Sequence, residues 1–120
     1  MTGRDPFSVT LRPSEGELTA AVLAAARLLG WRTAHFRPAR TAHGWRTPVQ
    51  GDGAGFPDLL LAHPRQARLL FRELKAGSPL RPEQAVWAEA LEACGCDWGI
   101  WRPDDWTSGA VEAALRGLAS

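Results

Sequence analysis

The hydrophobic positions of the chain change their spacing several times, and each change predicts a different element. The first group recurs every three or four residues, which is the spacing of one helix face. Its members are Leu18, Val22, Ala25 and Leu29. Ser14 before them is a good N-cap and Gly30 after them is a good C-terminal stop, so a first helix is predicted between these two residues.

The middle of the chain alternates between strand-like and loop-like stretches. Trp31–Phe36 is typical of a strand, whereas Arg37–Pro57 is rich in Gly, Pro and Arg and is expected to be one long loop. Two further strands are expected at Asp58–Ala62 and Arg68–Lys75. The short connection between them favours an antiparallel hairpin, with Ala62 opposite Arg68 if the loop has about five residues.

The last third of the chain begins with a helix signal. Pro82 suits the first turn of a helix that runs to about Cys94, where Gly95 ends it. One side of this helix carries Val86, Ala90 and Ala93. A short strand at Trp98–Trp101, a turn at Pro103–Trp106 and a final helix at Ser108–Leu118, capped by its serine, complete the expected elements.

This order of elements predicts an α/β sandwich around a small mixed sheet. The chain has 120 residues, of which 45% are hydrophobic, enough for one domain with one core. We expect residues 1–13 to be a flexible N-terminus and residues 14–120 to form that domain. No apolar stretch is long enough to span a membrane, so a soluble, cytoplasmic protein is expected. Cys94 and Cys96 flank one glycine, which favours reduced, structural thiols.

The formal net charge is only +1, but the charges are unevenly distributed. Residues 18–51 contain no Asp or Glu. The arginines of this segment are Arg27, Arg32, Arg37, Arg40 and Arg46. Such a segment can bind the phosphates of a nucleic acid, although a solvated arginine-rich surface is the simpler alternative.

Two acids and a lysine are expected to meet on the predicted hairpin. Alternate side chains of a strand share a face, so Glu73 and Lys75 point to the same side. The hairpin puts Asp58 opposite position 72 or 73, so its carboxylate can come within roughly 5 Å of that of Glu73. Two carboxylates that close require a proton or a cation, and a hard ion such as Mg²⁺ suits oxygen ligands. A metal ion there can activate water beside a phosphodiester.

Lys75 is the one lysine in a chain with thirteen arginines. A compact ammonium has therefore been kept two residues after a strand glutamate, where it can hold an attacking water or a phosphate. The simpler alternative is an exposed lysine at the strand end, paired with Glu73, because acid-x-Lys motifs recur by chance.

Longer stretches of sequence favour a functional Lys75 over an exposed lysine at a strand end. The sequences Gly-Phe-Pro-Asp-Leu-Leu-Leu at 55–61, Phe-Arg-Glu-Leu-Lys at 71–75 and Leu-Arg-Pro-Glu-Gln at 80–84 resemble the VRR-NUC branch of the PD-(D/E)xK nucleases. The resemblance extends to residues 35–38, 44–48 and 101–106, and it covers nearly the whole chain from Ser14. It implies a restriction-endonuclease-like α-β-β-β-α-β core and hydrolysis of DNA with Mg²⁺ or Mn²⁺.

The same resemblance implies roles for particular residues. Asp58, Glu73 and the carbonyl of Leu74 would bind metal, Lys75 would act in the chemistry, and Gln84 would orient the lysine or the water. A purely structural Gln84, bonded to the backbone at the helix start, is the alternative.

Relatives in this superfamily add a glutamate from the first helix, which would be Glu15 or Glu17 here. The helical wheel does not choose between them, and the position in the Ser-Glu-x-x-Leu pattern favours Glu15. Either acid could instead simply favour the positive end of the helix dipole.

Three other groups of residues were assigned. The glycines at 51, 53 and 55 open no helix, so they favour close backbone approach beside Asp58. The three histidines lack the spacing of a zinc site and are expected to contact solvent or DNA: they are His35, His43 and His63. Among the tryptophans, Trp87, Trp98, Trp101 and also Trp31 are expected in the core, whereas Trp45 could stack on a base or on its own loop.

The sequence thus predicts a metal-dependent DNA endonuclease acting on branched, flapped or Holliday-junction DNA. The expected DNA contacts are Arg37, Arg40, His43, Trp45 and Arg46. Symmetric cutting of a junction needs two sites and would imply a homodimer, and a helicase or repair partner is also plausible. The rival is a catalytically silent or partner-dependent DNA-binding module of the same fold.

Overall fold

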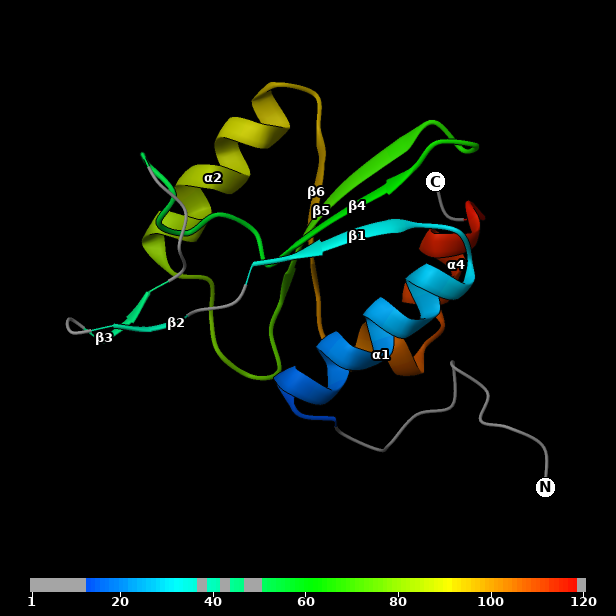
Figure 1. Cartoon of the computed structure of the whole chain (residues 1–120), viewed down its shortest axis with the longest axis horizontal. Helices are drawn as coiled ribbons and strands as arrows, with labels where there is room; N and C mark the ends of the chain where they lie inside the picture. Colours follow the sequence, from blue (N-terminus) through cyan, green and yellow to red (C-terminus); the bar gives the residue numbers. More distant parts are fainter. Residues whose placement is uncertain (1–12, 37–38, 42–43, 47–50, 119–120) are drawn as a thin grey trace.

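The computed structural model of the chain describes residues 13–36, 39–41, 44–46 and 51–118. These residues form a compact α/β fold with a four-stranded mixed sheet and helices on both of its faces (Figure 1). The helices are α1 (Glu15–Leu28), α2 (Pro82–Ala93), α3 (Pro103–Thr107) and α4 (Ala110–Arg116). The strands are β1 (Arg32–His35), β2 (Ala39–Thr41), β3 (Gly44–Arg46), β4 (Leu59–His63), β5 (Arg68–Leu74) and β6 (Asp97–Trp101).

Helix α1 begins where the sequence predicts it. Ser14 is the N-cap: its hydroxyl accepts from the Glu17 N–H at 3.1 Å, and the Glu17 carboxylate accepts from the Ser14 N–H at 3.0 Å. This reciprocal capping box satisfies two backbone donors that a helix start leaves unpaired. Leu18 and Val22 are fully buried on the sheet side of the helix, which confirms the predicted face.

The main sheet has the order β1-β4-β5-β6, with β1, β4 and β5 antiparallel and β6 parallel to β5. The predicted β4–β5 hairpin is confirmed, but its predicted register is wrong by one residue. Ala62 lies opposite Leu69, and His63 lies opposite Arg68. The connection has four residues, 64–67, because Ala67 adopts a positive φ of 53° that closes the turn early.

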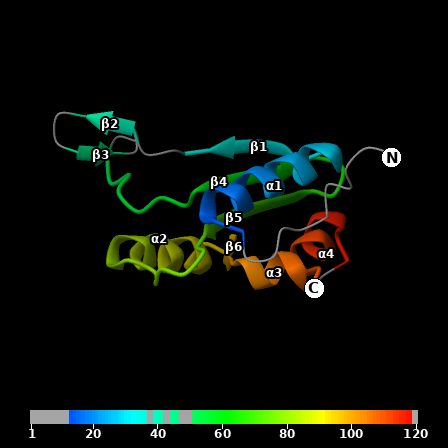
Figure 2. The same ribbon diagram turned by 90° about the horizontal axis from the view of Figure 1, so that it is seen from below.

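The stretch from 37 to 57 is not a single loop, as was expected. Within it, β2 and β3 pair antiparallel as a separate two-stranded sheet, with Arg40 opposite Trp45. Figures 1 and 2 show this hairpin extending beyond the end of the main sheet at which β1 ends and β4 begins. Each strand has three residues, too few to produce a readable alternation of apolar and polar positions.

Helix α2 has the predicted bounds but buries a different side. Val86 is 67% exposed, and Ala90 and Ala93 are also exposed, so the small apolar side of this helix faces solvent. The residues that turn toward the sheet are Gln84 and Ala88. A short amphipathic pattern made mostly of alanines is weak, and the location of the sheet decides which side it covers.

The end of the chain contains two short helices in place of the expected turn and single helix. Pro103 starts α3, and Asp105 caps it by accepting the Arg102 N–H at 2.8 Å. Ser108 ends α3, and the N-cap of α4 is Gly109 with a positive φ of 85°, so the serine lies one residue before the cap position; its hydroxyl still accepts the N–H of Ala110, the first residue of α4, at 3.3 Å. The prediction missed α3 because its pattern is too short to show a helical period.

One hydrophobic core lies between the sheet and the layer formed by α1, α3 and α4, while α2 lies on the opposite face (Figure 1). Of the tryptophans assigned to the core, Trp31 and Trp101 are buried in it, but Trp87 and Trp98 are only half-buried. Trp106, which was expected in a turn, is also buried in this core.

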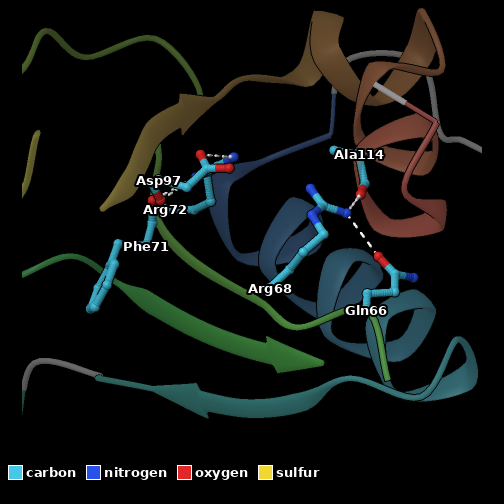
Figure 3. A network of polar contacts seen from close by, with 6 residues as sticks. All are labelled: Gln66, Arg68, Phe71, Arg72, Asp97 and Ala114. Carbon is cyan, nitrogen blue, oxygen red and sulfur yellow. Dashed lines mark hydrogen bonds and ion pairs between the residues drawn. The ribbon is translucent and has the colours of Figure 1, made fainter. Parts of the chain in front are cut away.

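Two arginines of β5 tie this core together (Figure 3). The guanidinium of Arg72 is stacked on the Trp101 ring at 4.9 Å and pairs with the Asp97 carboxylate at 2.8 Å. The Arg68 guanidinium donates to the Gln66 amide oxygen at 2.9 Å and to the Ala114 carbonyl. Arg72 therefore connects β5 to β6, and Arg68 connects β5 to α4.

None of the described helices is long and apolar enough to cross a membrane. Both cysteines have free thiols, with Cys94 exposed and Cys96 half-buried.

Candidate active site

The predicted catalytic residues lie in or next to β4, β5 and α2, the last of which contributes Gln84, and they meet on the α2 face of the sheet. Asp58 directly precedes β4, Glu73 lies near the end of β5, and Lys75 directly follows β5. Leu59 pairs with Arg72, so continuing the antiparallel register by one residue puts Asp58 opposite Glu73. Residues opposite each other across a pair of strands point to the same face, so both carboxylates lie on one side.

Asp58 is held from two directions. Its Oδ2 accepts the N–H of Leu74 at 2.9 Å, and its backbone carbonyl accepts the N–H of Phe36 at 2.9 Å. The first bond joins the carboxylate to β5 beside Glu73, and the second joins the chain before β4 to the end of β1. The position of Asp58 is therefore set by backbone donors of both neighbouring strands.

Glu73 is fully buried, with 0% exposure. Burial raises the pKa of its carboxyl to about 8, and the nearby charge of Asp58 and a hydrogen bond between the two carboxyls act in the same direction, while Lys75 opposes them. Within the described part of the chain, Glu73 Oε2 has no hydrogen-bond partner. A buried acid beside another acid calls for a proton or a cation.

Gln84 makes the backbone bond of the structural alternative and also contacts Glu73, while its expected role in orienting the lysine or the water stays a prediction. Its Nε2 donates to Glu73 Oε1 at 3.4 Å, and its Oε1 accepts the N–H of Arg81 at 2.9 Å, the N-cap residue of α2. The same side chain thus caps α2 and contacts the active-site carboxylate. Since Gln84 is 4% exposed, its amide is fixed by these bonds and not by solvent.

The segment before Asp58 is bound to α2 through contacts that the sequence analysis did not find. Gly55 has a φ of 82°, and a Cβ there would lie 2.4 Å from the backbone carbonyl of Glu83. The predicted close approach of this glycine is correct, but its partner is the start of α2. The Trp87 indole N–H also reaches back to the Asp52 carbonyl at 2.9 Å.

Phe56 is the centre of an aromatic cluster that lies next to the site. Its ring makes edge contacts with Phe36, Phe71 and Trp87, with centroid distances of 5.1, 6.2 and 5.0 Å. Edge-to-face packing of this kind adds stability beyond the buried area. The cluster joins β1, β5 and α2, so it fixes the chain that delivers Asp58. The signal in the sequence was an aromatic residue directly before Pro57-Asp58.

Lys75 is not the exposed strand-end lysine that was weighed as an alternative, since it is only 6% exposed. Its N–H donates to the Trp101 carbonyl at 3.1 Å, which continues the β5–β6 ladder by one residue. Its charge is close enough to Glu73 to lower the pKa of that carboxyl against the effect of burial.

The first-helix acids have less connection to this site. Glu17 belongs to the capping box, and its hydrogen bonds to Ser14 lower the pKa of its carboxyl. Glu15 is exposed and lines a separate hollow beside Thr19 and His35. Among the residues that the structure describes, no three or more His, Cys, Asp and Glu side chains are grouped closely enough to hold a metal ion.

The prediction that histidines contact solvent or DNA is wrong for His63, which is 5% exposed. Its Nε2 is 2.9 Å from the Leu29 carbonyl and its Nδ1 accepts the Gln66 N–H at 3.1 Å, so it joins α1 to the β4–β5 turn. The predicted DNA contacts Arg37 and His43 lie outside the described residues. For Arg40, Trp45 and Arg46 the structure describes the strands β2 and β3 but not the side chains.

The oxygen ligands available here fit a hard divalent cation that is bound by two carboxylates and otherwise by water and substrate. Magnesium commonly binds one or two carboxylates and completes its coordination with water and substrate phosphate. Asp58 and Glu73 provide these carboxylates, and Glu73 Oε2 is a buried acceptor with no hydrogen-bond partner among the described residues. No third acid is required for this kind of site.

Searches of protein-family models, of curated proteins and of solved structures returned no match to this chain.

Proposed function

We propose that this protein is a Mg²⁺- or Mn²⁺-dependent DNA endonuclease, with Asp58, Glu73 and Lys75 at its active site. The observation that carries the proposal is the meeting of a half-buried Asp58, a fully buried Glu73 and a buried Lys75 where β4 begins and β5 ends. Structural ion pairs rarely juxtapose two acids, because their repulsion has to be offset by a bound proton or cation. An arrangement of this kind is typical of a site that a metal ion completes.

The order of elements supports the restriction-endonuclease-like core that the sequence resemblance implies. A helix, three antiparallel strands, a second helix and a strand parallel to β5 follow one another as α1, β1, β4, β5, α2 and β6. The β2–β3 hairpin is then an insertion between the first and second strands of this core.

In the proposed reaction, water attacks the phosphorus of a phosphodiester, and the bond from phosphorus to the leaving oxygen breaks. The metal ion would polarise the phosphoryl oxygen and lower the pKa of a bound water. Asp58 and Glu73 would hold the ion, with the Leu74 carbonyl as a further oxygen beside them. The Lys75 ammonium would hold the attacking water or a phosphate oxygen through its compact charge.

Gln84 would act by orientation in this scheme. It donates to Glu73 Oε1, so the second oxygen of that carboxylate is the one left for a ligand. Because its own carbonyl oxygen is used by the cap of α2, the amide cannot rotate without breaking the start of that helix.

The test is cleavage of linear, flapped and four-way DNA with Mg²⁺ or Mn²⁺. Asp58→Asn is a sharper variant than Asp58→Ala, because asparagine can still accept the Leu74 N–H while the negative charge is lost. We expect Asp58→Asn and Glu73→Gln to lose cleavage and to stay folded. Glu89→Gln, which changes an exposed acid on α2, is the matched control and should cut normally.

Full cleavage by Asp58→Asn in Mg²⁺ would exclude the proposed site. DNA binding without cleavage by the wild-type protein under every metal condition would favour the rival, a catalytically silent or partner-dependent binding module. Preference for four-way junctions, together with a dimer in sedimentation equilibrium, would support junction resolution by a homodimer.

A further inference from the structure

Two cations lie side by side where the parallel strands β5 and β6 end. Leu74 pairs with Trp101, so Lys75 and Arg102 are the next residues of the two strands. Both line a hollow of about 470 Å³, which we call the Lys75–Arg102 hollow. Its wall also includes Gly77, Asp104 and Thr107. Neither Asp58 nor Glu73 lines this hollow, so it shares only Lys75 with the candidate active site.

Within the described part of the chain, no salt bridge includes Lys75 or Arg102. The cations that form salt bridges there are Arg72, Arg81 and Arg116. Among the residues that the structure describes, the Arg102 guanidinium donates to the Ser78 carbonyl, a neutral acceptor at 3.3 Å. A guanidinium has five N–H donors, so most of those of Arg102 remain for a ligand.

The buried lysine is the second sign of a ligand. Lys75 is 6% exposed, and no described carboxylate forms a salt bridge with it, whereas the buried arginine of the same strand, Arg72, is paired with Asp97. The Lys75 charge acts on the nearby Glu73 carboxyl, but without a salt bridge the cost of withdrawing this cation from water is only partly offset. A ligand with negative charge would recover that cost, and the opening beside Arg102 gives it access.

We propose that the Lys75–Arg102 hollow binds a backbone phosphate of a nucleic-acid strand, next to the phosphate that is cut. The position of that second phosphate rests on the proposed function. A guanidinium matches the geometry of two phosphate oxygens, and the ammonium supplies a point charge. The Thr107 hydroxyl offers a further donor at the wall of the hollow. The exposed Asp104 weakens the attraction and keeps the strand exchangeable.

The test measures binding of a fluorescent single-stranded oligodeoxynucleotide by anisotropy, in EDTA and across a salt series. Arg102→Ala should bind roughly tenfold more weakly, because it loses a charge-assisted contact. The slope of log affinity against log salt should fall by about 0.7, the contribution of one phosphate contact on a single strand. Arg102→Lys keeps the charge and should retain the slope.

Asp104→Asn should strengthen DNA binding, whereas Arg102→Ala should weaken it. A gain in affinity cannot result from misfolding, so this variant tests the hollow even if Arg102→Ala folds poorly. Removing the acid from the wall should strengthen binding, roughly threefold, because a repulsion between exposed charges is small. Arg65→Ala, which removes an exposed arginine from the β4–β5 turn at the other end of the sheet, is the control and should bind as the wild type.

Wild-type affinity and slope in both Arg102→Ala and Asp104→Asn would overturn the inference. Binding in EDTA needs no cleavage, so the two proposals fail separately. If the protein binds DNA through Arg102 but cuts none, phosphate binding in the hollow is supported and the nuclease proposal fails. If the protein cuts DNA and Arg102 makes no difference to binding, the nuclease proposal stands and phosphate binding in the hollow fails.

Discussion

Glu73 should make the metal-free protein less stable as the pH rises. In the folded state burial and Asp58 raise the pKa of this carboxyl to about 8, against 4.5 as its ordinary value. Between these values the folded protein holds a proton that the unfolded chain has released. The stabilising contribution is therefore fully present below about pH 4.5 and is lost as the pH rises through about 8.

The size of the effect follows from linkage. One proton held only in the folded state changes the free energy of unfolding by roughly 1.4 kcal/mol per pH unit. Between about pH 5.5 and 7.5 the wild type should therefore lose about 3 kcal/mol through Glu73. Glu73→Gln has no proton to release, so the difference in stability between the two proteins should change by the same amount.

The assay is urea unfolding followed by tryptophan fluorescence, in EDTA, for wild type and Glu73→Gln over this pH range. Titrating groups that do not interact with Glu73 contribute equally to both proteins and cancel in the difference. Glu89→Gln serves as the control for replacing an exposed glutamate, and it should follow the wild type. At the alkaline end Mg²⁺ should restabilise the wild type but not Glu73→Gln, because the cation takes the place of the proton.

Parallel curves of stability against pH for wild type and Glu73→Gln would refute this reasoning. They would mean that the Glu73 carboxyl is ionised in the folded protein at neutral pH, with water or another partner solvating it.

Three further results are expected. Lys75→Ala should lower turnover by orders of magnitude, far more than it weakens DNA binding, and Lys75→Arg should not restore turnover; weak binding at unchanged turnover would limit Lys75 to holding a phosphate. Gly55→Ala should cost about 2 to 4 kcal/mol in urea unfolding, because its Cβ meets the Glu83 backbone, whereas Gly51→Ala, also at positive φ but in open space, should cost less. Replacing Arg37, Arg40 and Arg46 together by alanine should reduce the slope of log affinity against log salt for duplex DNA by up to about three units. An unchanged slope would mean that the DNA lies elsewhere.

The sequence by itself determined the features that depend on neighbours along the chain. The N-cap at Ser14, the stop at Gly95 and the common face of Glu73 and Lys75 follow from residues close together along the chain. Local geometry fixes such relations in any fold, because a strand alternates its faces and a helix start has the same unpaired donors everywhere.

Local patterns were insufficient where an element was short or a partner was distant. The three-residue strands β2 and β3 and the five-residue α3 carry too few positions to show a period. The β4–β5 register depended on the turn, where the left-handed Ala67 removed one residue from the expected loop. A single-residue error in a hairpin moves every facing pair, even when both strands are predicted correctly.

Only the tertiary structure decided the chemistry of the site. The sequence indicated that Asp58 and Glu73 would meet, but their surroundings come from elements far apart in the chain. Helix α2 brings Gln84 to Glu73, and Gly55 gives the preceding segment room to lie against that helix. The shifted pKa of Glu73 comes mainly from its burial. Burial is a property of how layers pack, so no spacing of residues along the chain could have specified it.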